Sequence, residues 1–353
     1  MEKMHLLVLF GGQSSEHEVS CRSVVTVLKA LDRERYEVMV TGITKDGRWV
    51  LVEDESRIAQ DCWQQAETAA ILSPEAARRG VWLMKGTETV FRPVDVVFPV
   101  LHGAGGEDGA IQGLLELAKI PYVGCGILSS AVSMEKVYTK KIVEDLGIRQ
   151  ADYVVAYRER LRTKEGMDEA VAAVETKLSY PLFVKPSASG SSCGVSRAEN
   201  RVQLVKGLLE AANHSRRVLA EAAVAGREVE CAVLGNLDAR ASGVGEILAA
   251  AQFYDYDAKY NNPDSRTVVD PNLPGDAAGQ IRRAAVDIFR AVDGRGLARV
   301  DFFVEDGSGQ VIFNEINTMP GFTAISMYPL LWKARGLSTE ELVERLIQSA
   351  LER

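Results

Sequence analysis

The chain has 353 residues, and its charge balance excludes one large class of partner. It carries 41 basic and 49 acidic side chains, a net charge of −8, which disfavours unspecific binding to a nucleic-acid backbone. Hydrophobic residues make up 46% and charged residues 25% of the sequence, as in ordinary globular enzymes. The length predicts two or three domains. We therefore expect no nucleic-acid partner, whereas a phosphate ligand stays open because it needs only a few local cations.

Cysteine usage and apolar runs point to a cellular location. The five cysteines are widely spaced and form no CxxC pair, so we expect a reducing compartment and neither a disulfide framework nor a zinc site. The first apolar run is short and breaks at Gly11-Gly12, which indicates a strand and not a signal peptide. No apolar run approaches the roughly 20 residues of a membrane span. We expect a cytoplasmic protein that does not bind membranes.

In chain order, the first third alternates between strand and helix patterns. Strand patterns occupy residues 6–10, 36–43 and 94–100, and apolar residues recur at helical spacing over 24–31 and 111–118. This alternation predicts a parallel sheet with helices on its faces. Residues 46–92 are more polar and less periodic, and we interpret them as a variable excursion.

The middle and last thirds predict two further units. A helix over 134–146, a strand over 181–185, a helix over 202–212 and a strand over 218–221 form a small α+β unit. Strands follow over 228–234, 297–304 and 310–316, and helices near Leu330 and Leu342 close the chain. The polar segment 254–275 is long for a compact domain, which is typical of an active-site lid.

The last two predicted strands carry charged residues among apolar neighbours. Asp306-Gly307 lies between them, so they are expected to form a hairpin. Arg299 and Asp301 share one strand face, and Glu315 and Asn317 are also two residues apart. Two carboxylates and an amide oxygen on one face suit hard divalent cations, chiefly Mg²⁺. An ion pair of Arg299 with Asp301 or Glu315 on a solvated face explains the same pattern.

A second signal is the stretch from Lys185 to Gly194, KPSASGSSCG. A strand delivers a lysine, and small residues then let backbone N–H groups approach phosphate oxygens. The spacing is not that of a Walker A loop. A plain surface turn is the alternative interpretation.

Weaker signals are two acids and two loops. Glu221 and Glu228 flank a turn at Gly226 and can accept hydrogen bonds from a base or a sugar, although, taken alone, they are better explained as solvated surface acids. The loops 11–20 and 102–109 follow predicted strands, where ligands bind in open α/β sheets. Helix capping explains these loops as well: by Ser14 or Ser15 supported by Glu18 in the first, and by His102 in the second.

Taken together and in order, these segments resemble the D-alanine–D-alanine ligases of the ATP-grasp superfamily. The strings that carry the resemblance are GGQSSEHEVS, HGAGGEDG, FVKPSASGSSCGVS, GREVECAVLGN, FYDYDAKY, GLARVDFF and NEINTMPGFTAIS, within residues 6–351. The resemblance implies an α/β and α+β fold. A Rossmann-like substrate-binding domain (1–125) precedes a two-part ATP-grasp fold. The two parts are a central subdomain (126–219) and a catalytic subdomain (220–353) with its lid at 254–275.

The resemblance also implies site residues at matching positions. For ATP they are Lys136, Lys185, Ser191, Glu221, Val224, Glu228 and Lys259. For the amino acids they are Glu16, His102, Lys259, Ser326 and Met327. The implied catalytic residues are Glu16, Ser191, Tyr260, Arg299, Gly321 and Ser326, and the implied ligands of two Mg²⁺ or Mn²⁺ ions are Asp301, Glu315 and Asn317.

More specific roles follow from the same resemblance. Glu221 and Val224 would contact the adenine and Glu228 the ribose. Glu16 would receive the ammonium of the first D-alanine and join Ser191 and Tyr260 in a link that closes the lid. Arg299 and the Gly321 N–H would stabilise the tetrahedral intermediate.

The implied reaction is an ATP-dependent carboxylate–amine ligation that makes D-alanyl-D-alanine for peptidoglycan, by a homodimer. A carboxylate is a poor electrophile, so ATP first converts it to an acyl phosphate that a closed lid protects from water. One rival keeps this chemistry and takes D-lactate or D-serine second, although Tyr260 argues against lactate. A kinase that stops after phosphoryl transfer and a non-catalytic nucleotide or amino-acid sensor are the other rivals.

Overall fold

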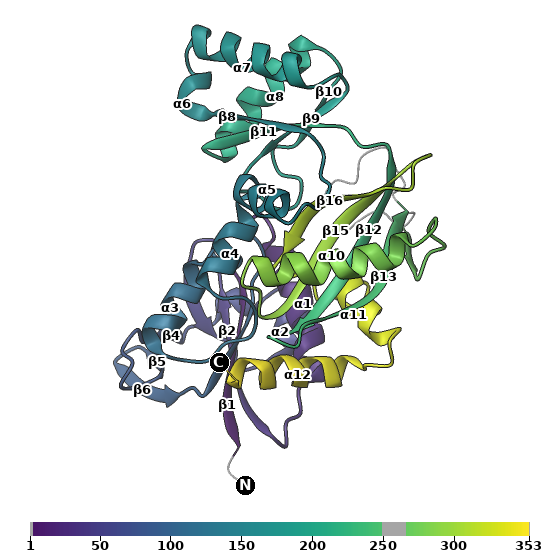
Figure 1. The fold of residues 1–353 in the computed structure, drawn as a ribbon. Coiled ribbons are helices and arrows are strands. Elements are labelled where there is room, and N and C mark those ends of the chain that lie inside the picture. Colours follow the sequence, from purple (N-terminus) through teal and green to yellow (C-terminus); the bar gives the residue numbers. More distant parts are fainter. Residues whose placement is uncertain (1–2, 249–265, 353) are drawn as a thin grey trace.

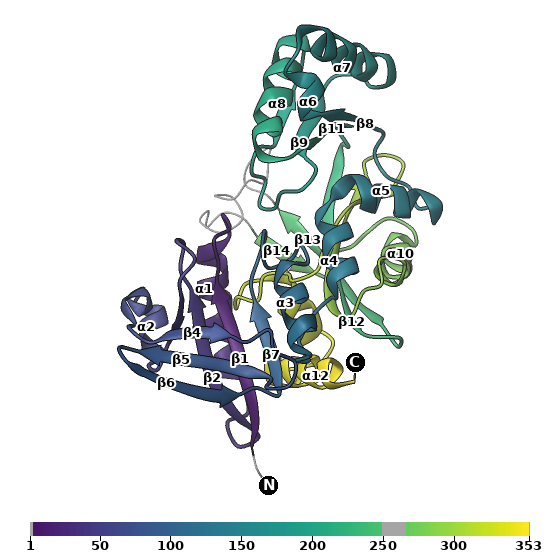
Figure 2. The ribbon, with the colours of Figure 1, turned by 90° about the vertical axis from the view of Figure 1, so that its left-hand side faces the viewer.

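A computed structural model describes residues 3–248 and 266–352. Within these residues the chain forms three sheets, one in each of three successive parts of the sequence (Figures 1 and 2). Helices cover the sheets, so the predicted mixture of α/β and α+β architecture is confirmed. None of the helices in this described part is both long and apolar enough to cross a membrane.

The N-terminal sheet is only partly parallel. Strand β1 (Met4–Gly11) runs parallel to β2 (Tyr36–Ile43) on one side and to β7 (Val96–Val100) on the other. Residues 46–92, interpreted as a variable excursion, have regular structure that the sequence analysis did not predict. They extend the sheet by antiparallel pairing through β3 (Trp49–Leu51), β4 (Ala69–Leu72), β5 (Gly80–Lys85) and β6 (Glu88–Pro93).

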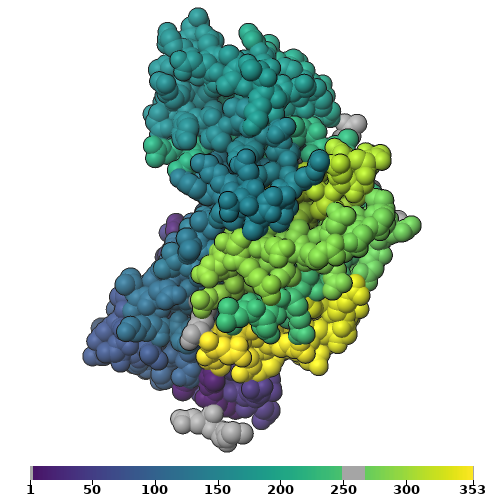
Figure 3. Space-filling model, in the orientation of Figure 1, coloured from purple at the N-terminus to yellow at the C-terminus, as the bar shows by residue number. Residues whose placement is uncertain are grey.

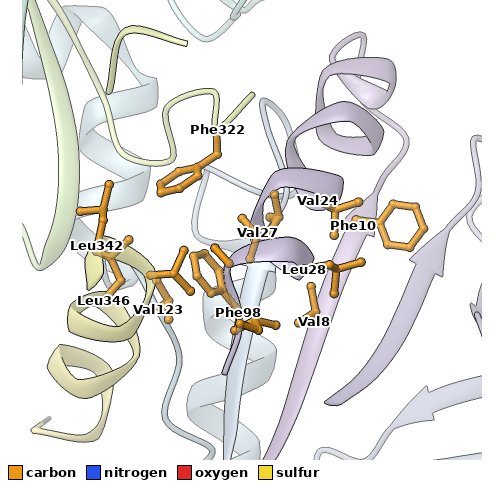
Figure 4. Close-up of a cluster of buried hydrophobic side chains, with 14 of the residues drawn as sticks. Val8, Phe10, Val24, Val27, Leu28, Phe98, Val123, Phe322, Leu342 and Leu346 are labelled. Carbon is orange, nitrogen blue, oxygen red and sulfur yellow. The ribbon is translucent and has the colours of Figure 1, made fainter. Parts of the chain in front are cut away.

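Alternating side chains of β1 build two cores, one on each face of this sheet. Leu7 and Leu9 pack with α3 (Ala110–Ala118) on one face. Val8 and Phe10 pack on the other face with the apolar stripe of α1 (His17–Ala30), beside the short helices α2 (Ser56–Ala59) and η1 (Trp63–Gln65). Figure 4 shows this second core, which continues through Phe98 and Val123 to the C-terminal helix. The first and last parts of the chain therefore share one hydrophobic core.

The central lobe stands at one end of the molecule (Figures 1 and 3). Its sheet has the order β10-β9-β11-β8, formed by β8 (Tyr153–Tyr157), β9 (Leu182–Pro186), β10 (Ser196–Ala198) and β11 (Arg217–Ala222). Its helices are α6 (Arg158–Leu161), α7 (Lys164–Lys177) and α8 (Arg201–His214).

The helix predicted over 134–146 is confirmed as α5 (Lys136–Asp145). A further helix, α4 (Ile127–Met134), which the sequence did not predict, precedes it. The two helices are separated by Glu135, whose φ of −91° and ψ of 88° are not helical. The break turns α5 away from α4 and places Lys136 at the first position of the new helix, facing the loop that follows β9.

The C-terminal sheet is antiparallel throughout, in the order β14-β13-β12-β15-β16. Its strands are β12 (Gly226–Gly235), β13 (Arg240–Leu248), β14 (Arg266–Val269), β15 (Gly296–Glu305) and β16 (Val311–Asn317). The predicted β15–β16 hairpin is confirmed. The segment predicted as a lid is not loop throughout, because β14 lies inside it; residues 254–265 lie outside the described part.

Three helices complete this part of the molecule. α10 (Ala277–Ala291), which the sequence did not predict, packs on the sheet through an apolar face that contains Ile281, Ala285 and Ile288. α11 (Met327–Lys333) and α12 (Thr339–Leu351) were predicted. Leu342 and Leu346 of α12 point into the N-terminal core (Figure 4).

Candidate active site

A cavity of about 560 Å³ lies between the central lobe and the C-terminal sheet. Ten of the predicted site residues line it: Glu16, Lys136, Lys185, Ser191, Glu221, Val224, Glu228, Asp301, Glu315 and Asn317. They come from all three parts of the chain. A larger hollow of about 1040 Å³ lies beside β3 and β4 in the N-terminal domain. None of the described residues lining that hollow belongs to the predicted site.

The deepest charged group on the central-lobe side is Glu221. Its carboxylate forms ion pairs with both Lys140 and Lys185, and it is buried, so its interpretation as a solvated surface acid was wrong. Burial by itself would raise the pKa of Glu221, but the charges of Lys185 and Lys140 outweigh burial and hold this pKa below its usual 4.5. Glu221 is thus an anion fixed between two cations.

Lys136 connects two walls of the cavity. Its ammonium donates to the carbonyl of Ser189 at 2.9 Å and lies 3.2 Å from a carboxylate oxygen of Glu315. Its side chain is only 14% exposed. The loop after β9 and the strand β16 are therefore joined through one cation, the kind of group that phosphate oxygens attract.

A row of three carboxylates crosses the C-terminal sheet. Strand register places Glu230 of β12 beside Asp301 of β15, and Asp301 beside Glu315 of β16. Arg299 binds both oxygens of Asp301, at 2.7 and 2.6 Å, and lies 3.1 Å from Glu230. The ion pair of Arg299 with Asp301 does form, yet it is buried and does not lie on a solvated face.

The three predicted metal ligands carry the oxygen atoms that a metal site needs, and the strand register brings them close together. Arg299 lies beside Asn317 in the register, and Asn317 donates from its amide to Asp301 at 3.1 Å. Among the described residues no cluster of three acidic, histidine or cysteine side chains could hold a metal ion. The predicted set of metal ligands is not a cluster of that kind, because its third donor is the amide oxygen of Asn317. Two carboxylates and one amide are hard oxygen donors of the kind that Mg²⁺ takes.

The loop after β9 meets the N-terminal domain at Glu16. The hydroxyl of Ser191 donates to the Glu16 carboxylate, so this part of the predicted three-residue link is present. Ser191 and Ser192 have φ angles of 49° and 56°, in the left-handed region that non-glycine residues rarely occupy. A plain turn needs no such pair of residues, and strain of this kind gathers where a ligand is held.

His102 is buried and does not cap a helix. Its Nδ1 lies 2.8 Å from the carbonyl of Met319, and its Nε2 lies 2.9 Å from the hydroxyl of Ser23. Because a carbonyl only accepts, Nδ1 carries the proton and Nε2 accepts from Ser23. Both nitrogens are therefore engaged within the protein, next to the loop that carries Gly321.

The remaining predicted residues lie around that loop or beyond the described part. Ser326 begins α11, and its hydroxyl accepts from the Thr323 N–H at 3.0 Å. Met327 is buried against Gly245 of β13. Neither lines the 560 Å³ cavity. Lys259 and Tyr260 lie outside the described residues. Neither Ser14 nor Ser15 caps α1, because its N-cap is Glu16.

Comparison with known proteins assigns the chain to a family. Family profiles described as "D-ala D-ala ligase N-terminus" and "D-ala D-ala ligase C-terminus" match residues 5–125 and 142–348. A D-alanine–D-alanine ligase of Acetivibrio thermocellus is 48% identical, with 100% of this chain and 97% of the relative covered. The chain belongs to the D-alanine–D-alanine ligase family.

Other members of the D-alanine–D-alanine ligase family agree in sequence and in fold. A relative from Ruminiclostridium cellulolyticum is 46% identical over 100% of this chain and 96% of its own length. The crystal structure of VanG D-Ala:D-Ser ligase from Enterococcus faecalis has a TM-score of 0.88 and 34% identity, covering 99% of this chain and 100% of the other. A D-alanine–D-alanine ligase from Coxiella burnetii has a TM-score of 0.86 and 34% identity, covering 100% and 95%.

Four residues in or beside the candidate site were missed in the sequence. Lys140 follows Lys136 by four positions, so both lie on one helix face. Glu230 follows Glu228 by two, and hence shares its strand face. Those spacings were visible signals. Ser23 and Glu107 gave none, because their partners are backbone groups some 300 and 212 residues away in sequence.

Proposed function

We propose that the protein joins two D-alanines in an ATP-dependent reaction, through a D-alanyl phosphate, to supply D-alanyl-D-alanine for peptidoglycan. The observation that carries the proposal is full-length membership of the D-alanine–D-alanine ligase family, together with one cavity lined by ten of the site residues predicted for such a reaction. Relatives that are 43–48% identical and cover the whole of this chain bear the name D-alanine–D-alanine ligase.

The cavity offers suitable groups for ATP. Lys136 and Lys185 are cations at the cavity wall and would bind phosphate oxygens. Glu221 and Val224 would contact the adenine, and Glu228 the ribose. Asp301, Glu315 and Asn317 would hold two Mg²⁺ or Mn²⁺ ions, whose chemistry when bound is to neutralise phosphate charge.

The amino acids would occupy the side toward the N-terminal domain. Glu16 would bind the ammonium of the first D-alanine. Ser191 would hold the Glu16 carboxylate in place through its hydrogen bond. His102, Lys259 and Ser326 would lie around the second D-alanine, whose neutral amine attacks the acyl phosphate. Arg299 and the Gly321 N–H would then stabilise the negative oxygen of the tetrahedral intermediate, while Tyr260 would help to close the lid.

The biological setting follows from the same proposal. We place the enzyme in the cytoplasm, as a homodimer formed through its N-terminal domain, with neither nucleic acid nor membrane as a partner. Sedimentation of the purified chain tests the dimer directly: a monomer at working concentrations contradicts it.

Product identification tests the activity. The enzyme is incubated with ATP and Mg²⁺, with and without D-alanine, and ADP release is measured. Release only with D-alanine excludes a sensor, and dipeptide among the products excludes a kinase. Mixtures of D-alanine with D-serine and D-lactate then define the second substrate, and the likeness to VanG makes D-serine the alternative to examine. Failure to form D-alanyl-D-alanine contradicts the proposal.

A further inference from the structure

The loop after β16 is held from both sides by the N-terminal domain. Met319 is bound at both of its backbone groups. Its N–H donates to Glu107 at 2.8 Å, and its carbonyl accepts from His102 at 2.8 Å. Both partners belong to the loop after β7, more than 200 residues earlier in the chain.

A second hold lies three residues further on. The N–H of Phe322 donates to the hydroxyl of Ser23 in α1 at 3.0 Å, and that hydroxyl in turn is bonded to His102. The Phe322 ring is buried in the N-terminal core near Phe98 (Figure 4). Gly321 is consequently flanked by two backbone positions that the N-terminal domain fixes.

Glu107 is the carboxylic acid of this arrangement. One of its oxygens accepts from Met319, and the other accepts from the N–H of Gly103 at 2.8 Å, so each oxygen has a backbone donor. The residue is only 8% exposed. Burial raises the pKa of Glu107 to about 8, and the Glu16 carboxylate adds to this shift, whereas the two N–H donors and Arg299 oppose it. A carboxyl buried at such a cost serves a defined geometry.

We propose that Glu107 is a positioning residue that, through the Met319 N–H, sets the place of the Gly321 N–H for the developing oxyanion. The inference rests on the proposed ligase function. An oxyanion donor must be oriented before charge develops, and a misplacement of about 1 Å can cost a hundredfold in rate. Pro320 contributes no N–H, so orientation of this loop depends on the bonds at residues 319 and 322.

A purely structural role would give a different result, and Asp108 provides the matched control. Asp108 is the next residue of the same loop and also accepts two backbone N–H bonds, from Gly105 at 2.8 Å and Ala110 at 3.0 Å. Its partners lie within its own loop and at the start of α3. Loss of Asp108 weakens the loop without releasing Met319.

The experiment compares Glu107→Ala, Glu107→Gln and Asp108→Ala in the full chain. Two quantities are measured: the kinetics of dipeptide formation, and amide hydrogen exchange of the segment 318–326 without substrates. For Glu107→Ala we expect kcat to fall at least about tenfold below that of Asp108→Ala, with the KM for ATP within about twofold of wild type. Exchange in 318–326 should be faster in Glu107→Ala alone. Glu107→Gln keeps an acceptor oxygen and should recover part of kcat.

The outcomes separate this inference from the proposed function. If the wild-type enzyme makes no D-alanyl-D-alanine, the proposed function fails. If the wild type is active and Glu107→Ala matches Asp108→Ala in kcat, the positioning role fails. It also fails if exchange in 318–326 does not change. If Glu107→Ala does not fold, Glu107→Gln replaces it in the same hydrogen-exchange measurement. Slower turnover of Glu107→Gln without faster exchange in 318–326 contradicts the positioning role.

Discussion

The two sides of the candidate site are built by different means. On the side proposed for the nucleotide, here called the nucleotide side, charged side chains bind one another: Glu221 lies between Lys140 and Lys185, and Arg299 holds Asp301. On the amino-acid side, side chains bind backbone groups, as His102 does at Met319. The first arrangement engages, in ion pairs, the same charged groups that would bind a ligand. The second holds a loop in one position by hydrogen bonds to its backbone.

This difference implies different responses to ligand. A phosphate or metal ion entering the nucleotide side replaces existing ion pairs, so binding there exchanges one set of charges for another. Breaking a buried pair without replacement is costly. The amino-acid side needs no such exchange, because its hydrogen bonds orient the loop beforehand. Substitutions on the two sides should therefore change different quantities, and five variants probe this difference.

The largest expected effect is at the proposed metal ligands. Asp301→Asn and Glu315→Gln each remove one charge from the donor set, and the loss of several kcal/mol of transition-state stabilisation lowers ligation about a thousandfold. Steady-state turnover at ordinary Mg²⁺ is the measurement. Asp306→Asn, in the exposed turn of the same hairpin, is the control and should behave like wild type. Near-normal turnover of either variant contradicts the metal assignment.

Glu221→Gln tests the buried ion pairs through stability. The substitution leaves Lys140 and Lys185 without the anion that lies between them, so unfolding free energy at pH 7 should fall by about 3 kcal/mol. Since the folded-state pKa of Glu221 is lowered, its contribution is present above about 4.5 and is lost as pH falls below that value. The gap between variant and wild type should shrink in acid.

Denaturant unfolding between pH 7 and pH 2 measures this effect. Glu144→Gln on the exposed face of α5 is the control, because it removes a carboxylate that is not buried. A gap that stays constant with pH would show that Glu221 contributes by packing and not by charge.

Lys185→Ala addresses ATP directly. Lys185 stands at the end of β9 and lines the cavity, so its loss should raise the KM for ATP and lower kcat, each by about tenfold. Lys141→Ala, an exposed lysine of α5, should leave both unchanged. A change confined to the KM for D-alanine, with ATP kinetics as in wild type, would show that Lys185 acts on the amino-acid side and not on the nucleotide side.

Some strands of the fold could be predicted from the sequence and others could not, for physical reasons. Strands such as β2 and the β15–β16 hairpin were predictable, since β-branched and aromatic residues lie between clear turn signals. The strands β3 to β6 were not, because they are three to six residues long and partly exposed, and tertiary pairing overrides weak local preference. The break at Glu135 also gave no signal, since neither glycine nor proline lies there.

The site was predictable where chemistry repeats along an element. Spacing placed Asp301 on one strand face with Arg299, and Glu315 on one face with Asn317, whereas Lys185 was found through the loop that follows it. Burial was not predictable: Glu221 in isolation resembled a surface acid, because its two lysines lie on another helix and another strand. Contacts between side chains and distant backbone, such as Glu107 with Met319, leave no pattern in either segment.

The smallest expected effect is at the junction of the two sides, where Ser191 donates to Glu16. Ser191→Ala removes this donor and keeps a non-glycine residue at the same φ of 49°, so backbone strain is unchanged. A net hydrogen bond of this kind is worth about 1 kcal/mol, so the KM for the first D-alanine should rise about fivefold. Ser189→Ala is the control, because that hydroxyl bonds only within its own loop, to Gly190 and Cys193, in the described structure. Initial rates over a range of D-alanine concentrations, at saturating ATP, measure both variants. If Ser191→Ala raises the KM for ATP and leaves that for D-alanine alone, the hydroxyl belongs to the nucleotide side, and Glu16 is held by other groups.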